Sequence, residues 1–192
     1  MGKRALAWRL RWIAASDRRR LARLSREHPG FHVDPSASSA LGTGTFHLYE
    51  GARVRFGAGV VTERRFDGLR VSVRENAELD IGENVWLRSD LAPVLLYVYP
   101  GAKLEIGADS FLNGCMVSAK AGVKLGRGVW LGPGTRVFDA DQHDLVPGLG
   151  ALFGVVGGKH DDTGRSPRRG RQALGDNVPR GLRVQARVQD LV

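Results

Sequence analysis

Leu104-Glu105-Ile106-Gly107 is one of four copies of a short pattern, and this pattern decides which fold the sequence predicts. Each copy reads Val or Leu, any residue, a large apolar residue and glycine. Successive copies begin 25, 25 and 19 residues apart. Around them, apolar residues recur every six positions, as at Val73, Leu79 and Val85. The four copies occupy residues 54–57, 79–82, 104–107 and 123–126.

A six-residue period fits neither a helix, which repeats every 3.6 residues, nor the two-residue alternation of one long strand. It indicates coils of three short strands, each of which places a residue at the same point on an inner wall. One coil of roughly 18 residues cannot bury its apolar side chains alone, but stacked neighbours form a continuous core. A β-sandwich also has evenly spaced strands, yet it does not explain the strict spacing. We therefore expect an all-β fold, a parallel β-helix.

The unequal steps predict where the coils differ. Each step of 25 residues should be one coil plus an excursion at a corner, around residues 62–67 and 89–93. The glycine that closes each copy should stand at a corner, where it allows backbone geometry that a residue with a Cβ resists. The chain contains 26 glycines among 192 residues, which suits a fold rich in corners.

The composition indicates the cellular compartment of the protein. A single cysteine, Cys115, excludes an internal disulfide and suits a reducing compartment. No apolar run approaches the roughly 20 residues that span a bilayer. The N-terminus is basic, but Arg9 and Arg11 interrupt the apolar stretch that a signal peptide would need. These features predict a cytoplasmic protein.

The net charge of +9 is concentrated at the two ends of the chain. Residues 1–27 carry nine Lys or Arg and two acids, and residues 159–192 carry eight and four. The part between them carries twelve and fourteen, so the repeat region is slightly acidic. Nucleic-acid binding would need a basic patch interleaved with aromatic residues on the folded body. We therefore expect no nucleic-acid partner.

Residues 1–28 are expected to form a basic amphipathic helix that ends at Pro29 and Gly30. Such a helix can cap the first coil, which a solenoid needs at its end. It can also rest on an anionic membrane surface, or help subunits to associate. One helical face carries Leu6, Leu10, Ile13, Leu21 and Leu24, with Trp8 and Trp12 placed beside them.

The six-residue period stops after Val137, and polar residues gather in the next segment, 138–145. Loops that leave a rigid scaffold often carry function. His143 is flanked by Asp139, Asp141 and Asp144, any of which could orient an imidazole. A histidine with a pKa near 6.5 is a suitable general base toward a hydroxyl group.

The segment 104–143 resembles the active-site region of the hexapeptide-repeat acyltransferases, in particular the maltose and galactoside O-acetyltransferases. The family's Ile-Gly-x-x-x-Phe-Ile-Asn-x-Gly corresponds to residues 106–114, and its next two motifs correspond to residues 125–137 and 139–143. The resemblance covers about residues 46–145. It implies a left-handed parallel β-helix. The handedness rests on this resemblance alone, because nothing in the sequence itself predicts it.

The resemblance also implies a reaction. His143 would remove a proton from a hydroxyl of a sugar or glycan precursor while that oxygen attacks the thioester of acetyl-CoA, a co-substrate rather than a permanently bound cofactor. Asn113 matches a family asparagine near the acceptor pocket, although an asparagine at a coil corner can instead bond its own backbone. Asp141 can orient His143 or the sugar, or be a solvated loop acid. Family members are commonly homotrimers with sites between subunits.

Trp86 and Trp130 occupy equivalent places in two coils, next to residues expected to face inward. Their indoles are therefore expected to face outward, where aromatic side chains anchor subunit interfaces more often than they bind sugars. No metal is expected, because His160-Asp161-Asp162 lacks a metal-ligand spacing. A carbonic-anhydrase-type site would need three convergent histidines, and only His143 and His160 fall near the candidate site.

The C-terminal part departs from the family pattern. Residues 173–178 begin the expected further coil, but Pro179 cannot donate to a strand ladder and arginines follow where buried residues are expected. Either the product is truncated, or the tail uses its arginines to contact the phosphates of CoA. The alternative function is a truncated, catalytically inactive β-helix scaffold. The expected segments are 1–28 (helix), 29–145 (core), 146–171 (Gly/Arg-rich loop) and 172–192 (atypical C-terminal segment).

Overall fold

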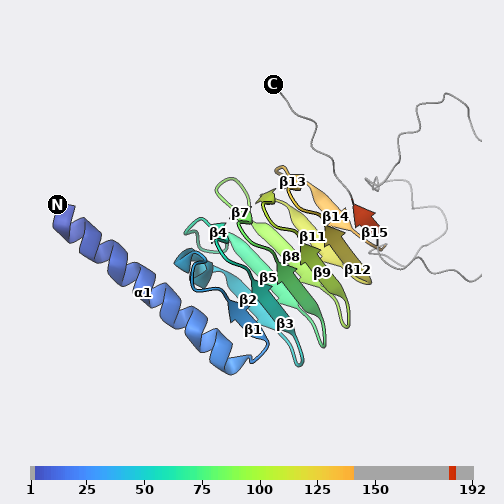
Figure 1. Ribbon diagram of the computed structural model, residues 1–192, viewed down its shortest axis with the longest axis horizontal. Coiled ribbons are helices and arrows are strands. Elements are labelled where there is room, and N and C mark those ends of the chain that lie inside the picture. Colours follow the sequence, from blue (N-terminus) through green and yellow to red (C-terminus); the bar gives the residue numbers. More distant parts are fainter. Residues whose placement is uncertain (1–2, 141–181, 185–192) are drawn as a thin grey trace, which may run out of the picture.

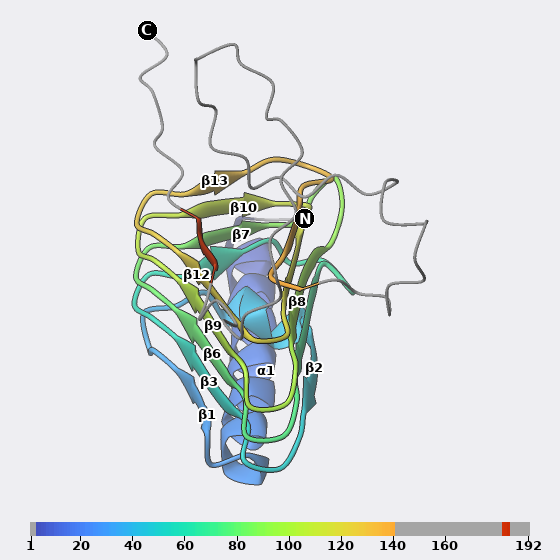
Figure 2. The ribbon, with the colours of Figure 1, turned by 90° about the vertical axis from the view of Figure 1, so that its right-hand side faces the viewer.

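The computed structural model describes residues 3–140 and 182–184. A long helix, α1 (Lys3–Glu27), precedes a stack of short parallel strands that wind as a β-solenoid. Figure 1 shows the strands stacked side by side beyond the helix, and Figure 2 shows three walls around an interior. The predicted parallel β-helix with an N-terminal helix is thereby confirmed, whereas its left-handedness stays a prediction.

Three parallel sheets form the walls. Sheet A contains β1 (Phe31–Val33), β3 (Arg53–Phe56), β6 (Glu78–Ile81), β9 (Lys103–Ile106), β12 (Gly122–Leu125) and β15 (Leu182–Val184). Sheet B contains β2 (Thr45–Leu48), β5 (Leu69–Val73), β8 (Val94–Val98), β11 (Met116–Ala119) and β14 (Arg136–Phe138). Sheet C contains β4 (Val61–Thr62), β7 (Trp86–Arg88), β10 (Phe111–Asn113) and β13 (Trp130–Leu131), and a short 3-10 helix, η1 (Ser39–Thr43), belongs to the first coil.

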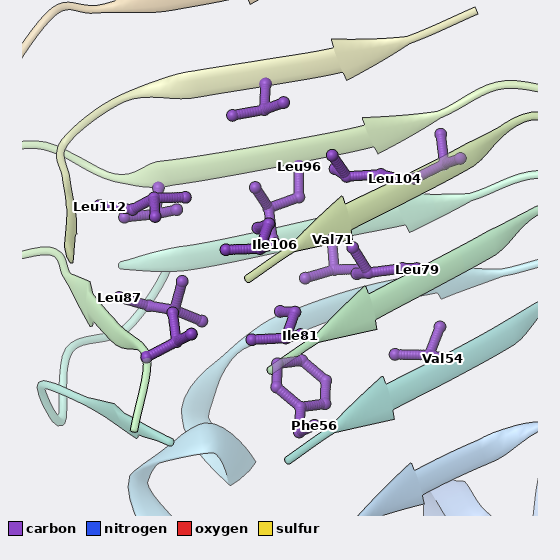
Figure 3. Packing of buried hydrophobic residues seen from close by; sticks show 14 of the residues in the cluster. Val54, Phe56, Val71, Leu79, Ile81, Leu87, Leu96, Leu104, Ile106 and Leu112 are labelled. Atoms are coloured by element: carbon purple, nitrogen blue, oxygen red, sulfur yellow. The ribbon is translucent and has the colours of Figure 1, made fainter. Parts of the chain in front are cut away.

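The repeated pattern builds sheet A. Leu79 pairs in register with Leu104, and Leu104 with Val123, and all three side chains are buried. Figure 3 shows Val54, Leu79 and Leu104 on successive strands, with Phe56, Ile81 and Ile106 in a second set. Each fully buried Leu or Ile contributes roughly 1.5–3 kcal/mol through removal of its apolar surface from water. Residues one coil apart, 25 or 19 positions along the chain, thus stack in columns, whereas residues six apart, such as Val73 and Leu79, lie on different walls.

The column that contains Val85 and Val129 has one polar member, Ser110, which is also buried. Its hydroxyl donates to the carbonyl of Gly107 at 2.7 Å and accepts from the N–H of Val129 at 3.1 Å. Because both functions of the hydroxyl are used, the serine is tolerated inside the core.

The longer coils differ from the shorter one at two corners: mainly between sheets C and B, and also between sheets B and A, where four residues connect β8 to β9 and two connect β11 to β12. Residues 63–68 connect β4 to β5, and residues 89–93 connect β7 to β8, whereas only two residues connect β10 to β11. Both excursions were expected at these places. A hydrogen bond connects the two excursions: the carboxylate of Glu63 in the first accepts from the N–H of Ser89 in the second, at 2.6 Å.

The repeat glycines are needed for a different reason than expected. None of the four glycines that close the copies has a positive φ. Instead, each of the first three lies against the next coil: a Cβ on Gly57 would come within 2.8 Å of Gly82, and one on Gly82 within 2.6 Å of Ala108. Left-handed backbone occurs at the adjacent turns, for example at Gly59 (φ 65°) and Asn84 (φ 55°).

The second half of α1 caps the first coil. Leu21 is buried in the core and Leu24 packs against it. Asp17, also buried, forms an ion pair with Arg64 of the first excursion. Arg20 donates to the carbonyl of Gly44 at 3.3 Å. The expected capping role of the helix is therefore present.

The first half of α1 extends beyond the strands (Figure 1). Leu6 and Leu10 continue the stripe that carries Leu21, but they are 48% and 57% exposed. Trp8 and Trp12 were expected beside this stripe, but they lie on the opposite side of the helix. Each is two positions from Leu10, and positions two apart on a helix differ by about 200°. In the described part of the chain, no helix has the length and apolar character needed to cross a membrane.

The chain returns to sheet A with β15, which pairs in parallel with β12. Leu182 and Val184 are in register with Val123 and Leu125, and Arg183 with Lys124. The sequence has no six-residue apolar period after Val178, and arginines follow Pro179 where buried residues are expected. Leu182-Arg183-Val184 nevertheless repeats the first three places of the pattern, without its glycine, and forms a strand of sheet A.

Candidate active site

Two of the three residues singled out for chemistry, Asp141 and His143, lie outside the described residues. The first described part of the chain ends at Ala140, two residues after β14 (Arg136–Phe138). The third, Asn113, is the last residue of β10. Asp139, which directly follows β14, is the described acidic residue nearest in sequence to the two that are not described.

Asp139 binds the backbone of the preceding coil. Its Oδ1 accepts from the N–H of Lys120 at 2.7 Å, and its Oδ2 accepts from the N–H groups of Ala121, at 2.7 Å, and Gly122. Three consecutive amides thus converge on one carboxylate at the corner between β11 and β12. Hydrogen bonds to a carboxylate acceptor are the stronger kind, so the end of the first described part of the chain is anchored at this corner. This use leaves Asp141 and Asp144 as the better candidates to orient an imidazole.

Asn113 is 7% exposed, and its Oδ1 is buried with no hydrogen-bond partner among the described residues. The alternative in which this oxygen accepts from the local backbone is therefore not seen. The neighbouring residue, Gly114, has a φ of 49°, and a Cβ there would be 2.9 Å from that of Ala92. A buried acceptor without a partner costs roughly 1–3 kcal/mol, which makes this asparagine a feature that needs an explanation.

Asn113 and Asp139 lie at opposite ends of β11. Asn113 precedes the corner that leads into this strand, whereas Asp139 binds the corner that leaves it. The structure therefore does not bring these two residues together.

The outer face of sheet C carries a ladder of stacked aromatic side chains, which we call the aromatic ladder: Trp86, Phe111 and Trp130. They occupy one register position on β7, β10 and β13. Ring centroids are 5.1 Å apart between Trp86 and Phe111, and 5.5 Å apart between Phe111 and Trp130. Trp86 is 42% exposed and Trp130 68%, so the expected outward orientation of both indoles is confirmed. Phe111 was not singled out, although it occurs at the same place in its coil.

Two polar groups border the ladder. The indole N–H of Trp86 donates to Glu63 at 2.8 Å, and the Arg88 guanidinium lies over the Trp86 ring at 5.6 Å from its centroid. Arg88 also pairs with Asp90, and this bond, together with its charge, raises the pKa of the guanidinium and lowers that of the carboxyl. Glu63 was missed by sequence reasoning, because its partners lie one coil away.

The charges on the outer face of sheet A neutralise one another. Glu105 pairs with Lys103 at 2.7 Å and with Lys124 at 2.5 Å. Hydrogen bonds to the two ammonium groups, Lys103 first, lower the pKa of Glu105. A shallow depression of about 300 Å³ on this face is lined by Glu105, by Lys124 and by the Arg55–Asp80 pair. It offers an anionic ligand little unpaired positive charge.

Cys115 follows Asn113 by two residues and is buried. Burial raises the pKa of its thiol to about 12, so the thiolate that a nucleophile needs is not formed near neutral pH. Within residues 3–140 and 182–184, no group of three or more His, Cys, Asp or Glu side chains is placed to hold a metal ion.

No family model matches the chain, and no significant match is found among curated proteins or solved structures.

Proposed function

We propose that this protein is an acyl-CoA-dependent O-acetyltransferase that transfers an acetyl group to a hydroxyl of a sugar or glycan precursor in the cytoplasm. The observation that carries the proposal is the solenoid of six-residue repeats whose period ends where an acidic, histidine-containing stretch of sequence begins. This arrangement resembles that of the hexapeptide-repeat acyltransferases, whose β-helix is left-handed.

In the proposed reaction His143 is the general base. It accepts the proton of the sugar hydroxyl as that oxygen attacks the thioester carbonyl carbon. Backbone N–H groups of a neighbouring coil stabilise the oxyanion of the tetrahedral intermediate. The C–S bond then breaks, and the departing thiolate takes the proton from the imidazolium. Asp141 orients the imidazole or the sugar.

Asn113 is proposed as an acceptor-binding residue. Its unpartnered Oδ1 supports this role, because buried polar groups without partners occur where a structure serves a purpose other than stability. The aromatic ladder supports a homotrimer, since exposed Trp side chains stacked on a half-buried Phe are typical of interface anchors. Substituting Trp130 with Glu should dissociate the trimer in light scattering, whereas the exposed Phe66→Glu should not.

The acyl-transfer proposal is tested with His143→Ala. The full chain is incubated with acetyl-CoA and a panel of sugars, and the released thiol is measured. Turnover should fall by at least about 100-fold, which is the contribution of a positioned general base. His47→Ala is the matched control, since His47 is exposed on β2. Unchanged turnover in His143→Ala would contradict the assignment.

The alternative is a non-catalytic scaffold that retains the solenoid and has lost its donor site. It is motivated by the departure from the family pattern after residue 178. Isothermal titration with CoA distinguishes the two, because the enzyme should bind CoA with micromolar affinity and the scaffold should not.

A further inference from the structure

Helix α1 has two unlike faces. The face toward the solenoid carries Asp17, Leu21 and Leu24, which pack on or pair with the first coil. The opposite face has its own stripe at spacings of three or four residues, which we call the outer stripe. Its members are all exposed: Trp8, Trp12, Ala15, Arg19, Arg23 and Arg26.

The outer stripe is apolar at one end and cationic at the other. Trp8 and Trp12 are 70% and 61% exposed, large values for side chains of this size. Leu6 and Leu10 add exposed apolar surface to the same end of the helix. At the other end, Arg19 and Arg26 point away from the solenoid, as does Arg23.

The two acids of α1 offset little of the charge on the outer stripe. Asp17 is buried on the inner face and neutralised by Arg64. Glu27 forms a loose ion pair with Arg23, 3.9 Å long. The helix has nine Lys or Arg and only these two acids. A surface that covers the outer stripe must therefore be anionic, and a second copy of the same basic helix would be repelled.

We propose that the outer stripe of α1 docks the protein on an anionic lipid surface. The two indoles lie at the headgroup level, where tryptophan is favoured, and the arginines bind lipid phosphates. The helix lies in the plane of the surface, with the solenoid on its inner side. Its N-terminal half, which extends beyond the strands in Figure 1, enters most deeply because it is the apolar half. This inference does not depend on the proposed acyl transfer.

The test is sedimentation of the full chain with vesicles. One set contains phosphatidylglycerol and phosphatidylcholine, and the other contains phosphatidylcholine alone. We expect binding to the first set, little binding to the second, and loss of binding at high salt, because exposed charges are then screened. Equal binding to both sets would overturn the electrostatic part of the proposal.

Two pairs of variants locate the contact. Arg19→Gln/Arg26→Gln should weaken binding about 25-fold, at roughly fivefold for each arginine near the surface. The control, Arg127→Gln/Arg136→Gln, removes the same charge from the far coils and should weaken it far less. Trp8→Ala/Trp12→Ala should weaken binding at least about tenfold, whereas Phe66→Ala, which removes the 88% exposed aromatic of a corner loop, should not.

Circular dichroism shows whether each variant keeps its helix, so loss of binding by a folded protein is interpretable. If both α1 variants bind as the parent does, or if the control variants lose as much, the proposal is wrong. It is also wrong if no vesicle binds and Trp8→Ala/Trp12→Ala instead dissociates an oligomer in light scattering, since a second copy would then cover the stripe.

Discussion

Gly107 lies directly against Gly126 of the next coil, so that a Cβ built on Gly107 would be 2.4 Å from the carbonyl carbon of Gly126. The two glycines hold the same place in consecutive copies of the repeated pattern. Around Gly126 itself, no described atom lies within 4 Å of such a Cβ. Equivalent positions in the repeat therefore tolerate a side chain differently.

Gly107→Ala should destabilise the solenoid by about 1–3 kcal/mol, because backbone of the next coil must move to admit the methyl group. Gly126→Ala should cost nothing, or stabilise by up to about 1 kcal/mol, because alanine restricts the unfolded chain. Urea unfolding followed by circular dichroism measures both. Equal destabilisation by the two variants would show that the glycines are needed for backbone conformation instead.

The columns of the core were predictable because they depend only on spacing. Leu79, Leu104 and Val123 each begin a copy of the pattern, and parallel pairing in register follows once coils stack. The role of the glycines was not predictable in the same way. A close approach between Gly107 and Gly126 depends on the distance between coils, which no local pattern reports.

The site was predictable in residue type more than in geometry. Asn113 stood out by resemblance, but its unpartnered Oδ1 is a property of the folded corner. Asp139 was read as one of three possible partners of His143, and it instead accepts three backbone hydrogen bonds from residues 120–122. Such contacts join segments about a coil apart, so a sequence window does not contain them.

Asn113→Ala is expected to separate activity from stability. Since Oδ1 has no partner among the described residues, removing it should lower stability little, by about 1 kcal/mol or less. Acetyl transfer should nevertheless fall at least about tenfold if the amide binds the acceptor. Steady-state kinetics should show the loss mainly as a higher KM for the sugar.

Asn84→Ala is the matched control for that variant. Asn84 has a φ of 55° and donates from Nδ2 to Asp109 at 3.2 Å, so its loss should destabilise the corner by about 1 kcal/mol. It should leave the KM unchanged. If Asn113→Ala keeps full activity, Asn113 is a structural residue only.

Cys115 predicts a loss of stability at alkaline pH. Burial raises the pKa of its thiol from 9.0 to about 12, so between these values the unfolded chain releases the proton and the folded chain keeps it. The contribution of this thiol to the free energy of unfolding is therefore constant below about pH 9. It falls as pH rises toward 12, by up to about 1.4 kcal/mol per pH unit.

Urea unfolding at about pH 8 and about pH 10.5 measures this, with Cys115→Ala as the reference that removes the thiol. The stability difference between the parent and the variant should shrink by about 2 kcal/mol at the higher pH. Labelling with iodoacetamide near neutral pH should be slow in the folded protein and fast in urea. Rapid labelling without urea would contradict the burial of this side chain.

Asp139→Asn tests the hydrogen bonds that anchor Asp139 to the corner between β11 and β12. An amide keeps one acceptor oxygen for the three N–H groups of Lys120, Ala121 and Gly122, and it lacks the charge that strengthens these bonds. The free energy of unfolding should fall by about 1.5–3 kcal/mol. Hydrogen exchange should accelerate at the three amides and stay slow in the centre of β11. Asp109→Asn is the matched control, because Asp109 accepts from side chains at a corner on the outside of the solenoid and should not change exchange at residues 120–122. Unchanged exchange at those amides in Asp139→Asn would show that the carboxylate does not hold this corner.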